Sequence, residues 1–390
     1  MGHGTNILLS LFIVFVAAQI GAEIAQRLKL PGVVGEIAAG GVIGPSLLGW
    51  VQPAEALDVL AEIGVVLLLF SVGLETRLDE MKRVGRSAFL VGVLGVIVPF
   101  VLGSLWAHGS GFDWAKSTFV AAAFVATSAG ITARVLQELG ALQREEARVI
   151  LGAAVIDDIL AMLLLGIVTA LQSGESGASL NLGHLAIVLA EAVGFVVVIG
   201  VLGPRVMRRS SAWLEAPINP LSPLTIVLAL CLGLAFASTQ LGLAAIIGAF
   251  LAGMIASETQ QRETLERQTQ PLLALMTPFF FVVTGSKVEL AELANTDALL
   301  ALALITAIAI VSKLAGGFLG ALPLGKRSAL IVGVGMIPRG EVGVVVASLG
   351  LAAGVFSPRT YALIVAMSLL TAMITPPVLA ALLRADGIKK

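Results

Sequence analysis

Charged residues are scarce in this sequence, at 13% of 390 residues, against about 25% in a typical soluble domain. Hydrophobic residues make up 58% of the chain, and its mean hydropathy is +1.01. These values exclude a soluble globular domain and indicate an all-α polytopic membrane protein. The net charge of −1 says nothing about partners, and we expect no nucleic-acid partner.

The residues that most often carry chemistry are also few. The single cysteine, Cys231, excludes an intrachain disulfide. The three histidines, His3, His108 and His184, all fall at the ends of apolar runs, so none is expected to bind a metal or to act as a pH switch. The sequence contains no phosphate loop, metal cluster or nucleophile motif. We therefore predict a protein that is not an enzyme and has no cofactor.

Apolar runs fill most of the chain, and runs of about 17 to 25 residues can span a bilayer. The N-terminus has no basic region or cleavage pattern of a signal peptide, so its first run is expected to stay as a helix. Pro31, Pro271 and Asp297 are predicted to begin the second, tenth and eleventh spans. The predicted spans, about thirteen, are residues 6–26, 31–49, 57–76, 87–108, 115–137, 147–171, 184–207, 222–239, 241–256, 271–287, 297–322, 327–353 and 359–383.

Basic residues orient these spans, because they concentrate on the cytoplasmic side of a membrane. Three lie on one side, Lys116, Lys287 and Arg359, and eighteen follow the odd-numbered spans. The sequence therefore predicts an external N-terminus and a cytoplasmic C-terminus in the inner membrane. The eighteen are Arg27, Lys29, Arg77, Lys82, Arg83, Arg86, Arg144, Arg148, Arg205, Arg208, Arg209, Arg262, Arg267, Lys326, Arg327, Arg384, Lys389 and Lys390.

The chain resembles itself weakly at an offset of about 212 residues. Residues 35–40 (GEIAAG) recur as 248–253 (GAFLAG), and residues 72–78 (VGLETRL) recur loosely as 284–290 (TGSKVEL). Such short matches also arise by chance, but this offset is a shift of seven spans, which reverses direction through the membrane. We predict one membrane transporter unit, residues 1–390, with inverted repeats at about 6–171 and 222–383 joined by a linker helix at 184–207. Inverted repeats are typical of secondary transporters.

The repeat pairs the fifth span with the twelfth, and both have helix-breaking centres. The fifth contains Thr127, Ser128 and Gly130, and the twelfth contains Pro338 between glycines. Proline removes a backbone donor and disfavours helix in the residue before it, while Thr and Ser hydroxyls can satisfy freed backbone groups or bind ions. A kinked packing helix is the alternative, but two paired breaks beside buried charges favour an ion site.

Two adjacent carboxylates, Asp157 and Asp158, lie about ten residues into the sixth span, roughly 15 Å deep. A charge at the bilayer centre costs roughly 2.5 to 3.5 kcal/mol on insertion scales, so intramembrane acids are by default functional. Successive helix residues point about 100° apart, so we expect two different partners. The alternative for either aspartate is a buried ion pair that holds helices together.

Other charges lie inside the predicted spans. Lys313 is also near mid-depth and is expected to pair with a carboxylate, either as a proton carrier or as a static counter-ion. Arg134, Arg339 and Glu341 flank the two broken centres, where a scaffold role at half-helix ends is favoured over a role in ion passage. For the single acids we expect snorkelling or a local hydrogen bond; these are Glu36, Glu62 and Glu191.

Four motifs together resemble the monovalent cation/proton antiporter family, specifically bacterial electrogenic Na⁺/H⁺ antiporters of the NapA type. They are Thr127-Ser128, Ala-Val-Ile-Asp157-Asp158, Ser312-Lys313 with its following glycine pair, and Pro338-Arg339-Gly340-Glu341-Val-Gly343. The resemblance covers nearly the whole chain. It implies an NhaA-like antiporter fold of thirteen helices, a core domain, a dimerisation domain and a homodimer. It further implies that Asp158 carries the ion, that Asp157 pairs with Lys313 near the Na⁺, and that Thr127 and Ser128 line the site.

The same resemblance separates neighbouring branches. Electroneutral relatives replace the first aspartate with Asn and the lysine with Arg, and this chain does neither. Potassium-efflux relatives have Gln before the second aspartate and a large cytosolic nucleotide-binding domain, for which the few residues after the last span leave no room.

We therefore expect a secondary active, electrogenic Na⁺ (or Li⁺)/H⁺ antiporter that works by alternating access. Burial disfavours the charged form of a carboxyl group, so a proton and a cation can compete for Asp158. A K⁺/H⁺ antiporter is the alternative within transport, because ion selectivity depends on cavity shape. A channel is less consistent with paired helix breaks. An intramembrane aspartyl protease needs two carboxyls around one water, which adjacent residues of one helix do not provide.

Overall fold

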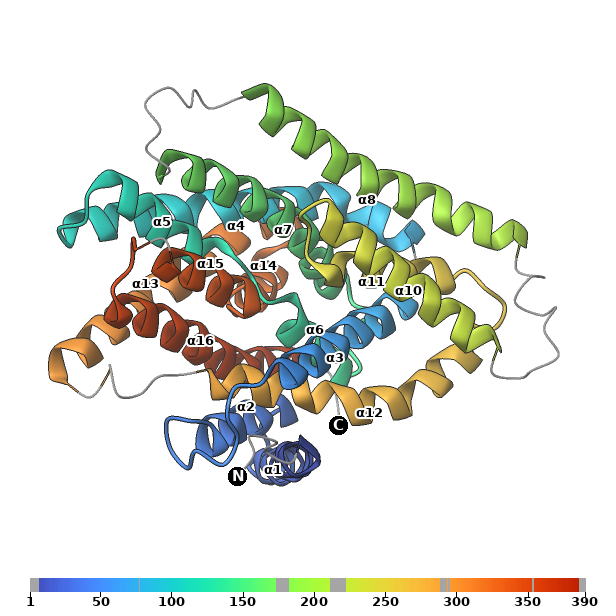
Figure 1. Cartoon of the computed structure of the whole chain (residues 1–390). Helices are drawn as coiled ribbons and strands as arrows, with labels where there is room; N and C mark the ends of the chain where they lie inside the picture. Colours follow the sequence, from blue (N-terminus) through green and yellow to red (C-terminus); the bar gives the residue numbers. More distant parts are fainter. Residues whose placement is uncertain are drawn as a thin grey trace.

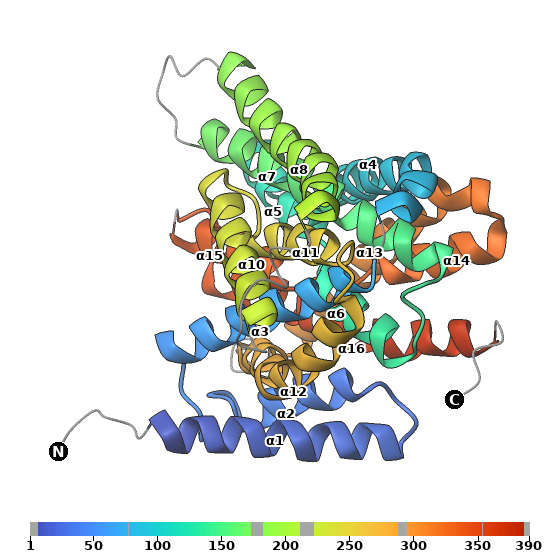
Figure 2. The same cartoon turned by 90° about the vertical axis from the view of Figure 1, so that its right-hand side faces the viewer.

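The computed structural model describes residues 7–76, 78–172, 182–210, 222–287, 293, 295–352 and 354–385. This part of the chain is helical and contains no strand. Figure 1 shows the helices packed as one bundle, with α8 along one outer side and α1 along the opposite side, an arrangement that Figure 2 repeats. The helices are α1 (Ile7–Arg27), α2 (Gly32–Ile43), α3 (Glu55–Leu74), α4 (Leu78–Gly109), α5 (Trp114–Val125), α6 (Ala129–Glu138), α7 (Glu145–Gln172), α8 (Leu182–Ser210), α10 (Ser222–Gln240), α11 (Ala245–Ala256), α12 (Arg262–Ser286), α13 (Thr296–Ala321), α14 (Lys326–Gly335), α15 (Glu341–Ala352) and α16 (Pro358–Ala385), with a short 3₁₀ turn, η2 (Leu322–Leu324), before α14.

The multi-pass membrane prediction is confirmed. Among the described residues, nine helical segments are long and apolar enough to cross a bilayer. Each of the thirteen predicted spans corresponds to one helix or to a broken pair of helices, α5–α6 and α14–α15. Helices α2 and α11 have only 12 residues each, too short to span alone, so the count of thirteen stays a prediction.

One predicted boundary was wrong. Pro271 does not begin a span, because α12 already begins at Arg262 and continues through both Pro271 and Pro278. The polar residues before Pro271 are good helix formers, and neighbouring helices can satisfy the carbonyl that a proline leaves free. Helix α4 begins at Leu78, before the predicted span 87–108, but its apolar segment, Arg83–Gly109, agrees with that span to within a few residues. Pro31 does precede the first residue of α2, as predicted.

The helices form two groups by their contacts. In the first, the core group, α4, α5, α7 and α13–α16 pack on one another, and α6 continues α5 toward α7 and α16. In the second, the panel group, α1–α3 pack with α10–α12. Helix α8 touches α7 and α4 on one side and α11 on the other. Contacts between the groups include α3 with α6, α2 with α6 and α2 with α16.

The glycines of the two sequence matches cross between helices in the panel group. Gly40 of α2 packs against Gly285 of α12, and Gly73 of α3 packs against Gly253 of α11. A methyl group at any of the four would collide with the backbone of the facing helix. Such close backbone approach is how small residues bring membrane helices together, so these four positions fix how α2, α3, α11 and α12 cross.

Candidate ion-binding site

Two helix breaks meet near the middle of the core group. The first lies between Val125, the end of α5, and Ala129, the start of α6. The second lies between α14 and α15 and contains Pro338. The Ser128 N–H donates to the carbonyl oxygen of Pro338 at 2.8 Å, so the two breaks satisfy each other's backbone. Both predicted breaks are therefore present, and the structure brings them into direct contact.

An ion pair lies at the first break. The Lys313 ammonium donates to Asp157 Oδ1 at 2.6 Å, and both side chains are fully buried. The other Asp157 oxygen, Oδ2, accepts from the Thr127 N–H at 3.0 Å. A buried pair compensates the cost of desolvating two charges only when further hydrogen bonds complete it, and this pair has them.

Two backbone carbonyls complete the lysine's surroundings. Lys313 Nζ also donates to the carbonyl oxygens of Val125, at 2.6 Å, and of Gly95, at 2.8 Å. Val125 ends α5, where carbonyls lack a helical partner and carry partial negative charge. Both acceptors are backbone carbonyls, which every residue has. Nothing in the sequence therefore distinguishes Gly95 or Val125 as a partner of Lys313.

The glycine pair that follows Lys313 lets α13 pack closely on α4 and α14, and this close packing positions Lys313. Gly316 packs against the backbone of α4 at Leu94, and Gly317 packs against Gly333 of α14. Side chains at these positions would push α13 away from both neighbours. The close packing of α13 therefore holds Lys313 within reach of Asp157.

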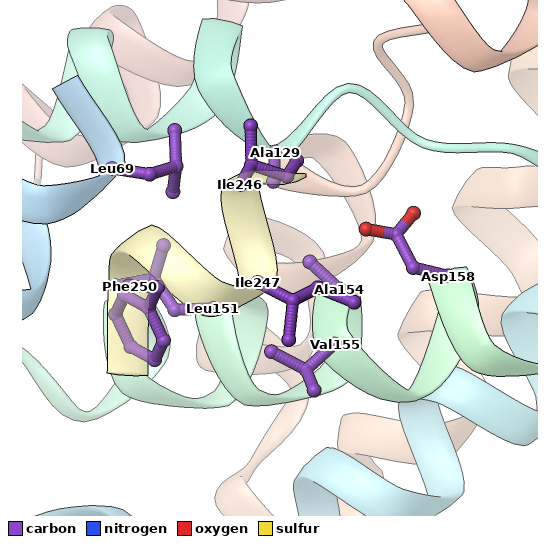
Figure 3. A pocket seen from close by; sticks show the side chains of 9 residues that line it. All are labelled: Leu69, Ala129, Leu151, Ala154, Val155, Asp158, Ile246, Ile247 and Phe250. Carbon is purple, nitrogen blue, oxygen red and sulfur yellow. The ribbon is translucent and has the colours of Figure 1, made fainter. Parts of the chain in front are cut away.

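Asp158 has different surroundings from Asp157, as the helical geometry predicted. It is 7% exposed and lies beside a cavity of about 20 Å³. Figure 3 shows its carboxylate pointing away from α7, with apolar side chains of α3, α7 and α11 around the cavity. Asp158 is the only charged residue in the lining, which also contains Leu69, Ala129, Leu151, Ala154, Val155, Ile246, Ile247 and Phe250.

The cavity is small, and both helix groups contribute to its lining. Leu69 comes from α3, and Ile246, Ile247 and Phe250 come from α11, so one wall belongs to the panel group. Roughly 10 to 15 Å³ of such volume is needed to hold one water molecule, so the cavity has room for about one water-sized species. A cation with its full hydration shell does not fit.

The hydroxyls of the first break are also buried. Thr127 is 3% exposed and its Oγ1 has no hydrogen-bond partner, and Ser128 is 1% exposed. Ser128 packs directly against Gly340 of the second break, where an added methyl group would collide with the serine side chain. An unpartnered buried oxygen is costly, and a cation that prefers oxygen ligands would use it.

The charges flanking the breaks have separate surroundings. Arg339 is fully buried, and its guanidinium donates to the carbonyl oxygens of Ile337 and Ala309, the latter at 3.0 Å. Its backbone N–H donates to Thr371 Oγ1 at 3.1 Å. Arg134 lies in the second turn of α6 and pairs with Glu138 at 2.9 Å. Glu341 begins α15, and its side chain lies outside the described residues. Arg339 thus binds one carbonyl of the break, that of Ile337, and one of the neighbouring helix α13, that of Ala309, which fits the scaffold interpretation.

These features match a known family. The chain matches the family described as "Sodium/hydrogen exchanger, transmembrane" over residues 10–385. It belongs to the sodium/hydrogen exchanger family. Members of this family are transporters and not enzymes, which agrees with the prediction from sequence and excludes the aspartyl protease alternative.

Individual relatives agree with this assignment. The high-affinity Na⁺/H⁺ antiporter NhaS3 of a Synechocystis strain is 36% identical over 99% of this chain and 91% of its own length. The Na⁺/H⁺-K⁺ antiporter GerN of Bacillus cereus is 34% identical over 94% of each chain. The solved structure of the sodium proton antiporter MjNhaP1 from Methanocaldococcus jannaschii covers 100% of both chains with a TM-score of 0.74 at 17% identity, a likeness of fold alone. The predicted family and antiporter fold are confirmed.

The structure brings most of the predicted site residues of this family member together. Asp157, Lys313 and Thr127 are joined by hydrogen bonds, Ser128 links the two breaks, and Asp158 opens onto the cavity next to Ala129. In the described part of the chain, no three His, Cys, Asp or Glu side chains cluster as a metal site would require. The roles of these residues in ion binding stay predictions.

Proposed function

We propose that the protein exchanges Na⁺ or Li⁺ for H⁺ and that Asp158 is the residue for which cation and proton compete. The observation that carries this proposal is a buried carboxylate at a cavity of about 20 Å³, beside two broken helices. Burial among apolar side chains disfavours the charged form of a carboxyl group. Asp158 can accept either a proton or a metal cation, and each excludes the other.

We propose that the cation's ligands come from Asp158 of α7 and from the first break. Asp158 supplies carboxylate oxygens, and the unpartnered Thr127 Oγ1 offers a neutral oxygen. Ser128, held against Gly340, is the next hydroxyl along the chain. Asp157 contributes negative charge close by while it stays bound to Lys313. Because the cavity is small, the cation must lose most of its water before it binds.

We infer that the exchange is electrogenic and that Lys313 carries the second proton. Na⁺ arriving near Asp158 repels the ammonium of Lys313, which lies 2.6 Å from Asp157. Loss of the lysine proton together with that of Asp158 gives two protons for one Na⁺. The static counter-ion alternative leaves Lys313 charged throughout and gives a one-for-one neutral cycle.

Alternating access is proposed as a movement of the core group against the panel group. The cavity wall is divided between the two groups, so a relative movement opens the site on one side and closes it on the other. The crossing glycines, Gly40 with Gly285 and Gly73 with Gly253, follow the offset of the two sequence matches. They support inverted repeats at about 6–171 and 222–383, joined by α8.

The surroundings of the protein are also proposals. We propose the inner membrane, an external N-terminus and a cytoplasmic C-terminus from the distribution of basic residues. We propose a homodimer from the family resemblance, and an apolar groove between α1 and α2 offers a surface for it. No cofactor beyond the transported ions is proposed.

The main alternative is exchange of K⁺ for H⁺. It is favoured by one observation: the relative GerN is described as a Na⁺/H⁺-K⁺ antiporter. The cavity holds about one water-sized species, which does not distinguish dehydrated Na⁺ from K⁺. We favour Na⁺ and Li⁺ because the relative NhaS3, at 36% identity, is described as a Na⁺/H⁺ antiporter.

Reconstitution tests this function. Proteoliposomes with an internal pH dye are given Na⁺, Li⁺ or K⁺ in turn. We expect dye responses to Na⁺ and Li⁺ and a weaker response to K⁺. A response to K⁺ alone would favour the K⁺/H⁺ alternative, and no response to any cation would contradict exchange.

A further inference from the structure

The last turns of α6 carry a polar contact between the two helix groups that the proposed ion site does not use. Arg134 Nε donates to Glu138 Oε1 at 2.9 Å, and Glu138 Oε2 accepts from the backbone N–H of Gly32 at 3.1 Å. Gly32 is the first residue of α2, where helix N–H groups lack internal partners. Glu138 therefore joins α6 of the core group to α2 of the panel group.

A second contact joins the same helix to α3. Gln137 Nε2 donates to Ser71 Oγ and to Glu75 Oε1, both at 3.1 Å. Glu75 follows the end of α3, and its backbone carbonyl accepts from Gln143 Nε2 at 2.6 Å and from Arg262 at 3.4 Å. Figures 1 and 2 both show α6 next to α3.

Glu36 lies one helical turn after Gly32, on the same face of α2. It is 3% exposed, and its Oε2 has no hydrogen-bond donor. The charged side chains that act on it come from α6: Arg134 attracts it and Glu138 repels it. Of the two expectations for Glu36, snorkelling or a local hydrogen bond, its burial excludes the first, whereas Glu62 and Glu191 are exposed.

The contact has more hydrogen-bond acceptors than donors. Gln137 Oε1 is a second buried oxygen without a partner. Around Glu36, two carboxyl groups share one guanidinium that is already bound to Glu138. Around Glu75, Glu266 adds negative charge, while Arg262 is bound to Glu266 at 2.7 Å. A proton on Glu36 or on Glu75 would add a hydrogen-bond donor and remove a repulsion between carboxylates.

We propose that Glu36 and Glu75 bind protons in a latch, separate from the Asp158 site, that holds α6 of the core group against the panel group. When both are protonated, α6 stays packed on α2 and α3. When they ionise, the unpartnered negative charge loosens the contact. Burial raises the pKa of the Glu75 carboxyl, and Glu266 raises it further, against the Gln137 hydrogen bond and Arg262.

The sign of the effect follows. Protons occupy a carboxyl below its pKa and leave as the pH rises, so the latch is tightest in acid and weakest in alkali. It responds to the side of the membrane where α3 and α6 end and α2 and α12 begin, which the basic residues predict to be cytoplasmic. Because the latch restrains the movement proposed for alternating access, it rests on that proposed function.

The test measures exchange in proteoliposomes while the pH on the two sides is set separately. Glu36→Gln keeps a donor and an acceptor and mimics the protonated form, and Glu36→Ala removes the group. Glu23→Gln is the matched control, since Glu23 is exposed and pairs only with Arg27 on α1, at the same end of the bundle. Glu75→Gln provides a second variant, at the residue that follows the end of α3.

Wild-type exchange is expected to rise with pH on the α6 side. Competition at Asp158 leaves some pH dependence in every variant. Beyond it, Glu36→Gln should stay slower than the wild type in alkali, and Glu75→Gln should change in the same direction. Glu36→Ala should be faster than the wild type in acid, and Glu23→Gln should follow the wild type. Hydrogen exchange of the α6 amides in the wild-type protein, corrected for intrinsic pH effects, should quicken in alkali, which tests the latch even where a variant fails to fold.

The outcomes separate the latch from the exchange function. If the wild type exchanges and Asp158→Asn does not, but the Glu36 and Glu75 variants keep the wild-type pH profile and α6 protection is unchanged by pH, the latch is refuted and the function stands. If the wild type does not exchange Na⁺ for H⁺ at any pH, the proposed function fails, and the hydrogen-exchange response of α6 still tests the latch by itself.

Discussion

Asp157 and Asp158 are neighbours in the chain but belong to different environments, because successive residues of a helix point about 100° apart. Asp157 is fully buried and bound to Lys313 and the Thr127 N–H. Asp158 faces a cavity whose other lining residues are apolar. Asp157 is thus bound to Lys313 and Thr127, and Asp158 has space beside it for a transported ion.

At Asp158 we expect the loss of the carboxylate to abolish exchange while the fold survives. Asp158→Asn keeps the size of the side chain and removes a buried charge, which need not destabilise the protein. Na⁺-driven dye responses in proteoliposomes should disappear, while the thermal midpoint stays near that of the wild type. Asp297→Asn, at an exposed carboxylate in the first turn of α13, is the control and should transport normally. Near-normal exchange by folded Asp158→Asn would remove Asp158 from the site.

At Lys313 two effects are expected, one on stability and one on charge movement. Lys313→Gln leaves Asp157 charged and buried without its cation, a change that costs about 3 to 5 kcal/mol in buried pairs, so the unfolding temperature should fall. The response of exchange to an imposed membrane potential, worth about 2.3 kcal/mol per charge per 100 mV, should weaken or vanish. A variant that stays fully electrogenic would make Lys313 a static counter-ion.

At the scale of the elements, the two breaks act as one unit because Ser128 and Pro338 share a hydrogen bond. Gly340 lies against the Ser128 side chain with no room for a methyl group. Gly340→Ala should therefore displace Ser128 and cost roughly 1 to 3 kcal/mol, as overpacking does, and should slow exchange. A control must replace a glycine that alanine can substitute without strain. Gly354 is unsuitable because its positive φ would strain an alanine.

A better control for Gly340→Ala is Gly194→Ala, where an added methyl group meets no atom within 4 Å. It should leave both the thermal midpoint and the rate of exchange unchanged. Equal behaviour of the two alanine variants would argue that the contact between the breaks is not important for transport.

The elements also show what the sequence can predict. Clusters of Thr, Ser, Gly and Pro placed both breaks correctly, because these residues disturb helices locally. The start of α12 was misplaced, because a proline that tertiary contacts tolerate is not distinguishable in sequence from one that begins a helix. The carbonyls of Gly95 and Val125, and the Glu138 contact with Gly32, depend on which helices meet. No local pattern contains that information.

At the scale of the whole molecule, the least constrained property is the orientation in the membrane. The helix packing alone does not say which end faces the cytoplasm. Eighteen basic residues against three predict a cytoplasmic C-terminus. A reporter active only in the cytoplasm should be active when fused after Lys390 and inactive when fused before Met1. The reverse pattern would overturn the orientation and would place the α6 latch on the external side.

The whole molecule also couples its parts through a single interface between the core and panel groups. The Asp158 cavity and the α6 latch both lie at that interface. Protons at the first are exchanged for the cation, and protons at the second restrain the movement that the exchange needs. Variants should therefore distinguish the two sites. Asp158 variants should lose exchange, whereas latch variants should keep exchange and change its dependence on pH.

The central claim is that a cation displaces protons from Asp158 and Lys313, and proton release on binding tests it most directly. Purified protein in weakly buffered solution is titrated with Na⁺ while the protons released per bound Na⁺ are counted. Because linkage is reciprocal, Na⁺ affinity should rise with pH by the same count. We predict a limiting value of two protons per Na⁺ in the wild type, one in Lys313→Gln and none in Asp158→Asn. Na⁺ binding to the wild-type protein without proton release would contradict the account.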